Sequence, residues 1–187
     1  MNKPTLLPVL LLFVLFSCQS TDQKKDEGFF PVLSFLKSQV THIDTSFYQL
    51  TKLTLVDSTW DTSYIKREEF RGYAKDFLDL PDLTDKNLFP KYEESKFFDA
   101  SLNRAIISYS PKDKKNLEIQ REEVTIEPNP ETRDQVKNII IDRLISSKDS
   151  TVTKRMLWTV NESFQVTSIV QKTGQPELTR TIKVTWQ

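Results

Sequence analysis

Alternating apolar and polar residues in the C-terminal half place the strongest constraint on the fold. The segment 177–186 is the clearest case, because its even positions are apolar apart from Arg180 and its odd positions are Thr, Glu or Lys. Successive side chains of a strand point to opposite faces, so this pattern predicts a strand with one buried and one solvated face. The complete set of predicted strands, which forms an antiparallel meander, is 103–110, 116–127, 136–146, 151–160, 163–171 and 177–186.

The parity of the apolar positions also predicts how neighbouring strands pair. Facing residues of an antiparallel pair point to the same side of the sheet, so their apolar faces must match. A tight turn at 148–149 meets this condition, because it pairs Ile141 with Met156 and Ile139 with Trp158.

The next connection follows from the same rule. A three-residue loop over 161–163 pairs Val160 with Phe164 and Trp158 with Val166. A two-residue loop would instead place apolar residues opposite polar ones, so we expect the three-residue loop.

The second predicted strand changes phase along its length. Its apolar residues are odd-numbered at Leu117 and Ile119 but even-numbered at Val124 and Ile126. Because a shift of one residue turns every side chain to the other face, we expect a β-bulge near Arg121–Glu123.

The N-terminal half has the periodicity of helices with one extended interruption. Apolar residues at spacings close to three and four form one stripe between Phe29 and Ile43. A second stripe of the same kind runs from Phe70 to Leu78. Each stripe predicts an amphipathic helix.

The segments between these stripes carry weaker signals. Ser63 is the expected N-cap of the second helix, and Pro81 is expected to end it. The Thr-rich segment 47–57 favours a strand. We expect a turn at 57–62 and irregular or partly helical structure over 83–101.

Together these patterns predict an α+β fold, in which N-terminal helices pack on one face of a twisted antiparallel β-sheet (meander) of five to seven strands. A sheet with one apolar face needs a cover, and the amphipathic helices are the candidates for it. Residues 28–187 are expected to form a single domain, because this length suits one core and no repeat or linker divides it.

A short apolar run follows a positively charged start at the N-terminus. The run extends from Leu6 to Phe16, after Lys3. It is shorter than the roughly 20 residues that a helix needs to cross a bilayer. Its length and flanks fit the apolar core of an export signal. It stops just before Cys18, the only cysteine of the chain.

The sequence Leu15-Phe16-Ser17-Cys18 resembles the lipobox of bacterial lipoproteins, in which a small residue precedes a Cys that becomes lipidated. The resemblance covers only residues 1–18. It implies that residues 1–17 are a signal peptide and that Cys18 carries fatty acyl chains such as palmitate. Two or three acyl chains on one residue anchor a protein stably, whereas one chain is marginal. The alternative is an ordinary signal peptide, with Cys18 as a free thiol.

The segment that follows the cysteine is entirely polar. Residues 18–27 therefore predict a lipidated Cys followed by a flexible tether. The part from Gln23 to Glu27 resembles the short Lys-plus-acidic surface-export tag of some Gram-negative lipoproteins. We expect a lipid-anchored protein of the outer membrane, and both the cell surface and the inner leaflet of that membrane stay open.

Composition excludes several classes of site. Lys+Arg and Asp+Glu number 26 each, so the formal net charge is zero and gives no general drive toward nucleic acid. One His and one Cys cannot build a zinc site of the usual Cys/His kind. The three Gly residues lie too far apart for a phosphate-binding loop. We therefore expect no cofactor and no metal.

The strand pairing produces one candidate ligand site. It places Arg143 opposite Lys154 and Arg180 opposite Ser168, with all four side chains on the helix-covered side near one end of the sheet. Two like charges that face a core are costly unless an anion, a carboxylate or water meets them. These residues are therefore the candidates for binding an anion or a polar headgroup.

Simpler interpretations exist for these and other polar residues. The long cationic side chains could reach solvent at the rim or pair with helix carboxylates such as Asp76 or Asp79. His42 near a helix end is explained by the helix dipole. The adjacent carboxylates Glu122 and Glu123 are expected on the solvated surface.

Aromatic residues concentrate between positions 64 and 98, where they predict core packing. The alternative is an apolar pocket or an exposed platform that binds carbohydrate or lipid. No nucleophile and base can be paired from the sequence, so we expect no enzymatic activity. We expect an envelope lipoprotein that binds a small apolar or anionic ligand or a protein partner. The alternative is a structural or assembly lipoprotein that acts only through protein contacts.

Overall fold

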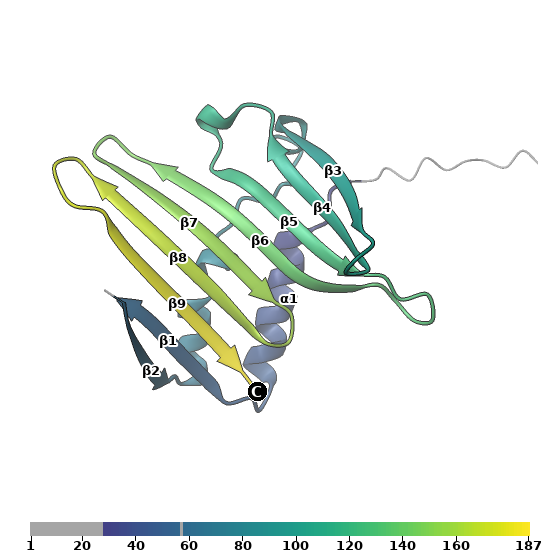
Figure 1. The fold of residues 1–187 in the computed structure, drawn as a ribbon, viewed down its shortest axis with the longest axis horizontal. Helices are drawn as coiled ribbons and strands as arrows, with labels where there is room; N and C mark the ends of the chain where they lie inside the picture. Colours follow the sequence, from purple (N-terminus) through teal and green to yellow (C-terminus); the bar gives the residue numbers. More distant parts are fainter. Residues whose placement is uncertain (1–27, 57) are drawn as a thin grey trace, which may run out of the picture.

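The protein has an α+β fold built on one antiparallel sheet. The computed structural model describes residues 28–56 and 58–187, and within them the sheet has nine strands in the order β2-β1-β9-β8-β7-β6-β5-β4-β3. Helices lie on one face of this sheet, and α1 crosses it obliquely (Figure 1). The predicted signal peptide, Cys18 and the tether fall outside the described residues.

The elements follow one another along the chain with short connections. The strands are β1 (Leu50–Val56), β2 (Thr59–Tyr64), β3 (Tyr92–Asp99), β4 (Arg104–Pro111), β5 (Ile119–Glu127), β6 (Gln135–Ser146), β7 (Ser150–Thr159), β8 (Ser163–Lys172) and β9 (Leu178–Trp186). The α-helices are α1 (Val32–Thr45), α2 (Arg67–Tyr73) and α3 (Lys75–Leu78), and the 3-10 helices are η1 (Phe89–Lys91) and η2 (Lys114–Asn116).

The sheet is larger than the five to seven strands expected from the sequence. The two additional strands are β2 and β3, which form the two edges of the sheet. Most side chains of both strands are exposed, so neither carries a continuous apolar alternation. The turn expected at 57–62 and the irregular structure expected over 83–101 were therefore wrong over these strands.

The central registers agree with the parity rule. Ile141 faces Met156 and Ile139 faces Trp158, as the turn at 148–149 requires. The predicted bulge is also present, slightly nearer the N-terminus than expected. Gln120 is the extra residue between two partnered positions of β5.

The β7–β8 loop has the predicted length but a different position. Trp158 faces Phe164, so the loop comprises residues 160–162 rather than 161–163. Asn161 at its centre has a φ of 64°, a left-handed conformation that Asn tolerates better than most residues. Parity cannot distinguish two registers that differ by two residues, because both keep the apolar faces matched.

The second predicted helix is divided into two short helices. Ala74 ends α2 and precedes α3, and Lys66 rather than Ser63 is the N-cap of α2. Ser63 lies in β2, so its assignment as a cap was wrong. The stripe residues Phe70 and Phe77 are nevertheless fully buried, as the helical spacing predicted.

An aromatic cluster joins α2 and α3 to the sheet. Trp158 stacks on Phe164 with ring centroids 5.5 Å apart, and Phe77 meets Trp158 edge-on at 5.2 Å. Phe70 and Trp186 complete the cluster, with 5.9 Å between their centroids. Burial of such rings and their offset geometry stabilise the contact between the two layers.

Trp158 is the residue whose truncation should most weaken the fold. It is fully buried, and its indole N–H has no hydrogen-bond partner within the described part of the chain. Trp158→Ala should lower the free energy of unfolding by about 3–5 kcal/mol, because it leaves a large cavity. Trp158→Phe should cost clearly less, since it keeps most of the ring contacts and removes the unpaired N–H. Urea unfolding measures both, and equal losses would contradict this role.

Candidate functional site

The registers of four neighbouring strands bring the predicted ligand residues into one line. Arg143 faces Lys154, Lys154 faces Ser168, and Ser168 faces Arg180. We call these four residues the polar row. Lys154 lies two positions from the fully buried Met156, so the polar row shares the face that the helices cover.

An apolar row flanks the polar row on each side. The inner row, toward the centre of the sheet, comprises Ile141, Met156, Val166 and Ile182. The outer row, toward the β6–β7 and β8–β9 turns, comprises Ile145, Val152, Val170 and Leu178. Met156 is fully buried, whereas Leu178 is 58% exposed, so the helix cover ends between the two apolar rows. The ends of these strands extend past the helices in Figure 1.

A pocket of about 450 Å³ lies at this border between covered and uncovered sheet. We call it the sheet pocket. Its walls combine residues of all three rows with Phe164 and two residues of the helices: Tyr73, Asp76, Val152, Lys154, Phe164, Val166, Ser168, Val170, Leu178, Arg180 and Ile182. Its volume falls within the range of small-molecule sites. The pocket therefore contains three of the four predicted ligand residues.

The charged groups of the sheet pocket are not equivalent. The Lys154 ammonium pairs with the Asp76 carboxylate at 2.5 Å, as one of the simpler interpretations anticipated. Arg180 is exposed and forms no ion pair with any described residue. Ser168 likewise has no side-chain hydrogen bond to the described chain and is partly buried. The Arg180 guanidinium and the Ser168 hydroxyl therefore line the pocket without a partner among the described residues, beside a lysine that is already ion-paired.

A third cation approaches the same wall from β1. The Lys52 ammonium donates a hydrogen bond of 3.3 Å to the Tyr73 hydroxyl and lies 5.1 Å from the centre of the Tyr73 ring. Tyr73 lines the sheet pocket, so Lys52 adds positive potential behind this wall.

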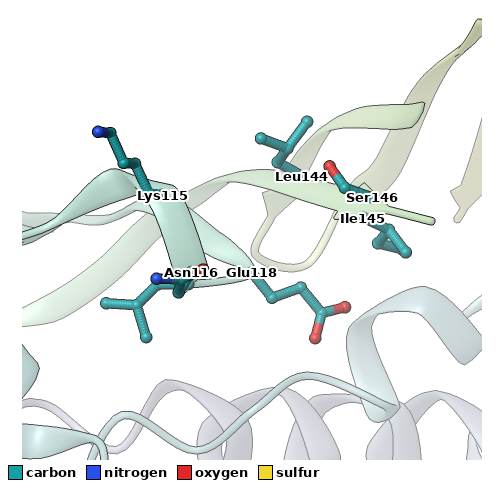
Figure 2. A pocket seen from close by; sticks show the side chains of 7 residues that line it. Lys115, Asn116, Glu118, Leu144, Ile145 and Ser146 are labelled. Carbon is teal, nitrogen blue, oxygen red and sulfur yellow. The ribbon is translucent and has the colours of Figure 1, made fainter. Parts of the chain in front are cut away.

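Arg143 does not belong to the sheet pocket. Its guanidinium pairs with the Glu118 carboxylate, and only 11% of its side chain is exposed. Figure 2 shows Glu118 reaching toward the helix side of the sheet, in a separate pocket that also includes Ile145 and Ser146. Because Glu118 already satisfies the guanidinium, Arg143 holds the start of β5 against β6 rather than facing an open site.

The remaining polar candidates are dispersed. His42 is exposed on α1 and contacts Tyr48. Asp79, the C-cap of α3, lies 3.9 Å from Lys75, whereas Asp76 turns toward the sheet. Sequence reasoning did not identify Tyr73 or the outer row as pocket residues. The alternation that places the outer row on the apolar face was visible in the sequence. The point at which the helices stop covering that face was not.

Glu122 is buried, although the sequence placed it on the solvated surface. Only 2% of Glu122 is exposed, and it faces Tyr109 on β4. The bulge at Gln120 shifts the parity of β5, which turns Glu122 toward the core and Glu123 away from it. Burial, and secondarily the negative charge of Asp82, raise the pKa of Glu122 to about 8. Glu122 is therefore predominantly neutral at pH 7.

Two tyrosine hydroxyls share this buried region. Burial and the nearby Glu122 carboxyl raise the pKa of Tyr92 to about 12, and the pKa of Tyr109 is also raised, chiefly by burial. The Tyr109 hydroxyl accepts a hydrogen bond of 2.7 Å from the Phe30 N–H, and the Tyr92 hydroxyl donates to the Ile119 carbonyl. Both hydroxyls are used in tying segments together, which favours a structural role for this cluster.

Comparisons with known proteins add no assignment to this geometry. No protein-family model, curated protein or solved structure matches the chain. Within the described residues, none of the helices combines the length and the apolar character needed to cross a membrane.

The buried Glu122 predicts an unusual pH dependence of stability. Between its ordinary pKa of 4.5 and about 8, the folded state keeps a proton that the unfolded state releases. The free energy of unfolding should therefore fall as the pH rises through this window. Glu122→Gln should match the parent protein near pH 5 and exceed it at pH 9 by on the order of a few kcal/mol.

Glu123→Gln is the matched control for this measurement. Glu123 is the next residue on the opposite face, where it pairs with Arg121, so its substitution should leave the pH slope of the parent unchanged. Urea unfolding across pH 5–9 provides the readout. A Glu122→Gln variant with the same pH slope as the parent would show that Glu122 does not titrate in this way.

Proposed function

We propose that this protein is a non-enzymatic, lipid-anchored envelope protein that binds a small amphiphilic anion in the sheet pocket. The observation that carries the proposal is the joining of Lys154, Ser168 and Arg180 to apolar walls in one cavity of about 450 Å³.

The chemistry of the walls favours a ligand with two different ends. The valines of β7 and β8, together with Phe164 and Ile182, offer apolar contact area. Arg180 offers a planar donor group suited to a carboxylate or a phosphate. Ser168 can donate a further hydrogen bond to the same group. A ligand without a charge would form no ion pair with Arg180, and a purely ionic ligand would leave the apolar walls in contact with water.

Anchoring at Cys18 supplies the cellular context of this proposal. The lipobox-like sequence 15–18 supports acylation, and residues 19–27 would then tether the folded domain to the outer membrane. A protein held at a membrane in this way meets fatty acids, lysolipids and other amphiphiles at high local concentration. The cell surface and the inner leaflet of the outer membrane are both compatible with the tether.

A second candidate function is a structural or assembly role through protein contacts alone. The edge strand β2 supports this alternative, because it exposes Trp60 at 50% and Tyr64 at 76%. Exposed apolar side chains on an unpaired strand edge are typical of surfaces that another protein covers. This alternative requires no ligand in the sheet pocket, so a binding measurement separates the two functions.

The first test compares three probes of equal chain length but different charge. Dodecanoate should bind more tightly than dodecanol or dodecyltrimethylammonium, because only dodecanoate can pair with Arg180. Arg180→Gln should weaken dodecanoate binding about 10-fold, which corresponds to the loss of one charge-assisted hydrogen bond. Isothermal titration calorimetry below the micelle concentration provides the dissociation constants.

Lys183→Gln is the matched control for Arg180→Gln. Lys183 is on the same strand, but it faces Leu53 and Gln165 on the opposite side of the sheet. The control should bind dodecanoate like the parent protein. Equal affinity of the parent for all three probes, or equal losses in the two variants, would contradict an anion-binding pocket.

The anchor makes a separate prediction. Cys18→Ser removes the only thiol of the chain, so the variant should not be acylated and should leave the membrane fraction for the soluble fraction. Centrifugal fractionation of the producing cells, with mass spectrometry of the purified protein, measures both effects. A Cys18→Ser protein that still sediments with membranes would refute anchoring through this residue.

A further inference from the structure

The hairpin of β3 and β4 carries the densest group of exposed large apolar side chains at one edge of the sheet. Phe97 is 64% exposed, Phe98 is 52% exposed and Leu102, in the connecting turn, is 66% exposed. We call these three residues the hairpin tip. Phe97 and Phe98 are successive residues of a strand, so they project from its two faces. The hairpin tip is therefore apolar on both sides, like a wedge.

The N-terminal end of the described chain is attached to this same edge. The Phe29 ring lies 4.3 Å from Phe89 and 4.4 Å from Tyr109, measured between centroids. The Phe30 N–H also donates to the Tyr109 hydroxyl. Tyr109 is on β4 and faces Glu94 on β3, so the chain enters the fold beside the edge strand that bears the hairpin tip.

The length of the tether decides which edge of the sheet stays close to an anchored Cys18. Residues 19–27 can span at most roughly 30 Å when fully extended. Eight strand spacings separate β3 from β2 in the sheet order, a width of roughly 38 Å. The hairpin tip is only a few residues along β3 from the attachment point. An anchor at Cys18 therefore keeps the β3 edge within roughly 30 Å of the membrane, whereas the β2 edge is free to lie farther away.

The charges around the hairpin tip are balanced by partners within the protein. Arg104 pairs with Glu127 at 2.7 Å, and Lys96 pairs with Glu94 at 2.9 Å. Asp99 accepts hydrogen bonds from the backbone N–H groups of Ser101 and Leu102. The tip thus presents apolar side chains without an excess of cations. Contact with a bilayer would then be driven by the apolar side chains and would depend little on anionic lipid or salt.

From these observations we infer that the β3–β4 hairpin tip inserts into the interfacial region of the membrane that holds Cys18. Phe and Leu are among the apolar side chains that surface-bound segments bury at the boundary between headgroups and acyl chains. The inference uses the anchor of the proposed function to place the membrane, but it is independent of the sheet pocket. Strands β4–β6 separate this edge from β7–β9, so the pocket would remain accessible from the side.

The test supplies the anchor chemically, so that it does not depend on acylation in cells. The chain from Cys18 onward contains every described residue, and Cys18 is its only cysteine. It can be coupled through Cys18 to a maleimide phospholipid in phosphatidylcholine vesicles. The indole introduced by Phe97→Trp, in a Trp60→Phe background, then reports depth through quenching by brominated phosphatidylcholine.

The native Trp60 is the matched control, because it is 50% exposed on β2 at the opposite edge. The difference between the parent and Trp60→Phe isolates its emission from that of the buried Trp158 and Trp186. We expect brominated lipid to quench the Phe97→Trp indole by at least half, both at low salt and at about 0.5 M salt, and to leave Trp60 unquenched.

Quenching at position 97 that is no greater than at Trp60 would overturn the inference, and the hairpin tip would then be a surface for a protein partner. Quenching that disappears at high salt would also overturn it, because it would show electrostatic adsorption. The outcome is separate from that of Cys18→Ser in cells. A protein that is not acylated in cells can still insert its hairpin tip into the vesicles. A protein that is acylated in cells can still fail the quenching test.

Discussion

The hydrogen-bonded register of β6 to β9 determines which side chains meet beneath the sheet. Antiparallel pairing with matched faces aligns the apolar residues in rows, and the helices can cover only those rows that they reach. Met156 of the inner row is fully buried, whereas Leu178 of the outer row is 58% exposed, so the helix cover ends between the two apolar rows. Because the cover ends at the polar row, a shift of a single strand by one residue would remove the site altogether.

The sheet pocket follows from this incomplete cover. A cation in the middle of a buried face would be costly, but at the border one cation can pair with a helix carboxylate while another stays in water. Lys154 pairs with the carboxylate of Asp76, whereas the exposed Arg180 stays in contact with water. The ion pair also ties α3 to β7, so the helix that limits the pocket is held in place by one of the residues that line it. Fold and candidate site therefore depend on the same contacts.

Parity predicted much of this arrangement from the sequence alone, including the pairs Arg143–Lys154 and Ser168–Arg180 and the six C-terminal strands. It could not predict the β7–β8 register, since a shift of two residues keeps every face matched. The edge strands β2 and β3 lack the alternation because little of either is buried. The burial of Glu122 depended on the position of the bulge, and the pocket depended on where the helices end, which no periodicity in the chain encodes.

The central claim is that an amphiphilic anion occupies the border between covered and uncovered sheet. The most direct measurement is an NMR titration of the ¹⁵N-labelled protein with dodecanoate. The account predicts saturable shifts of the backbone amides of Lys154, Ser168 and Arg180, together with those of Val152 and Val170 in the outer row. Shifts confined to the opposite face of the sheet, or none up to millimolar dodecanoate, would contradict it.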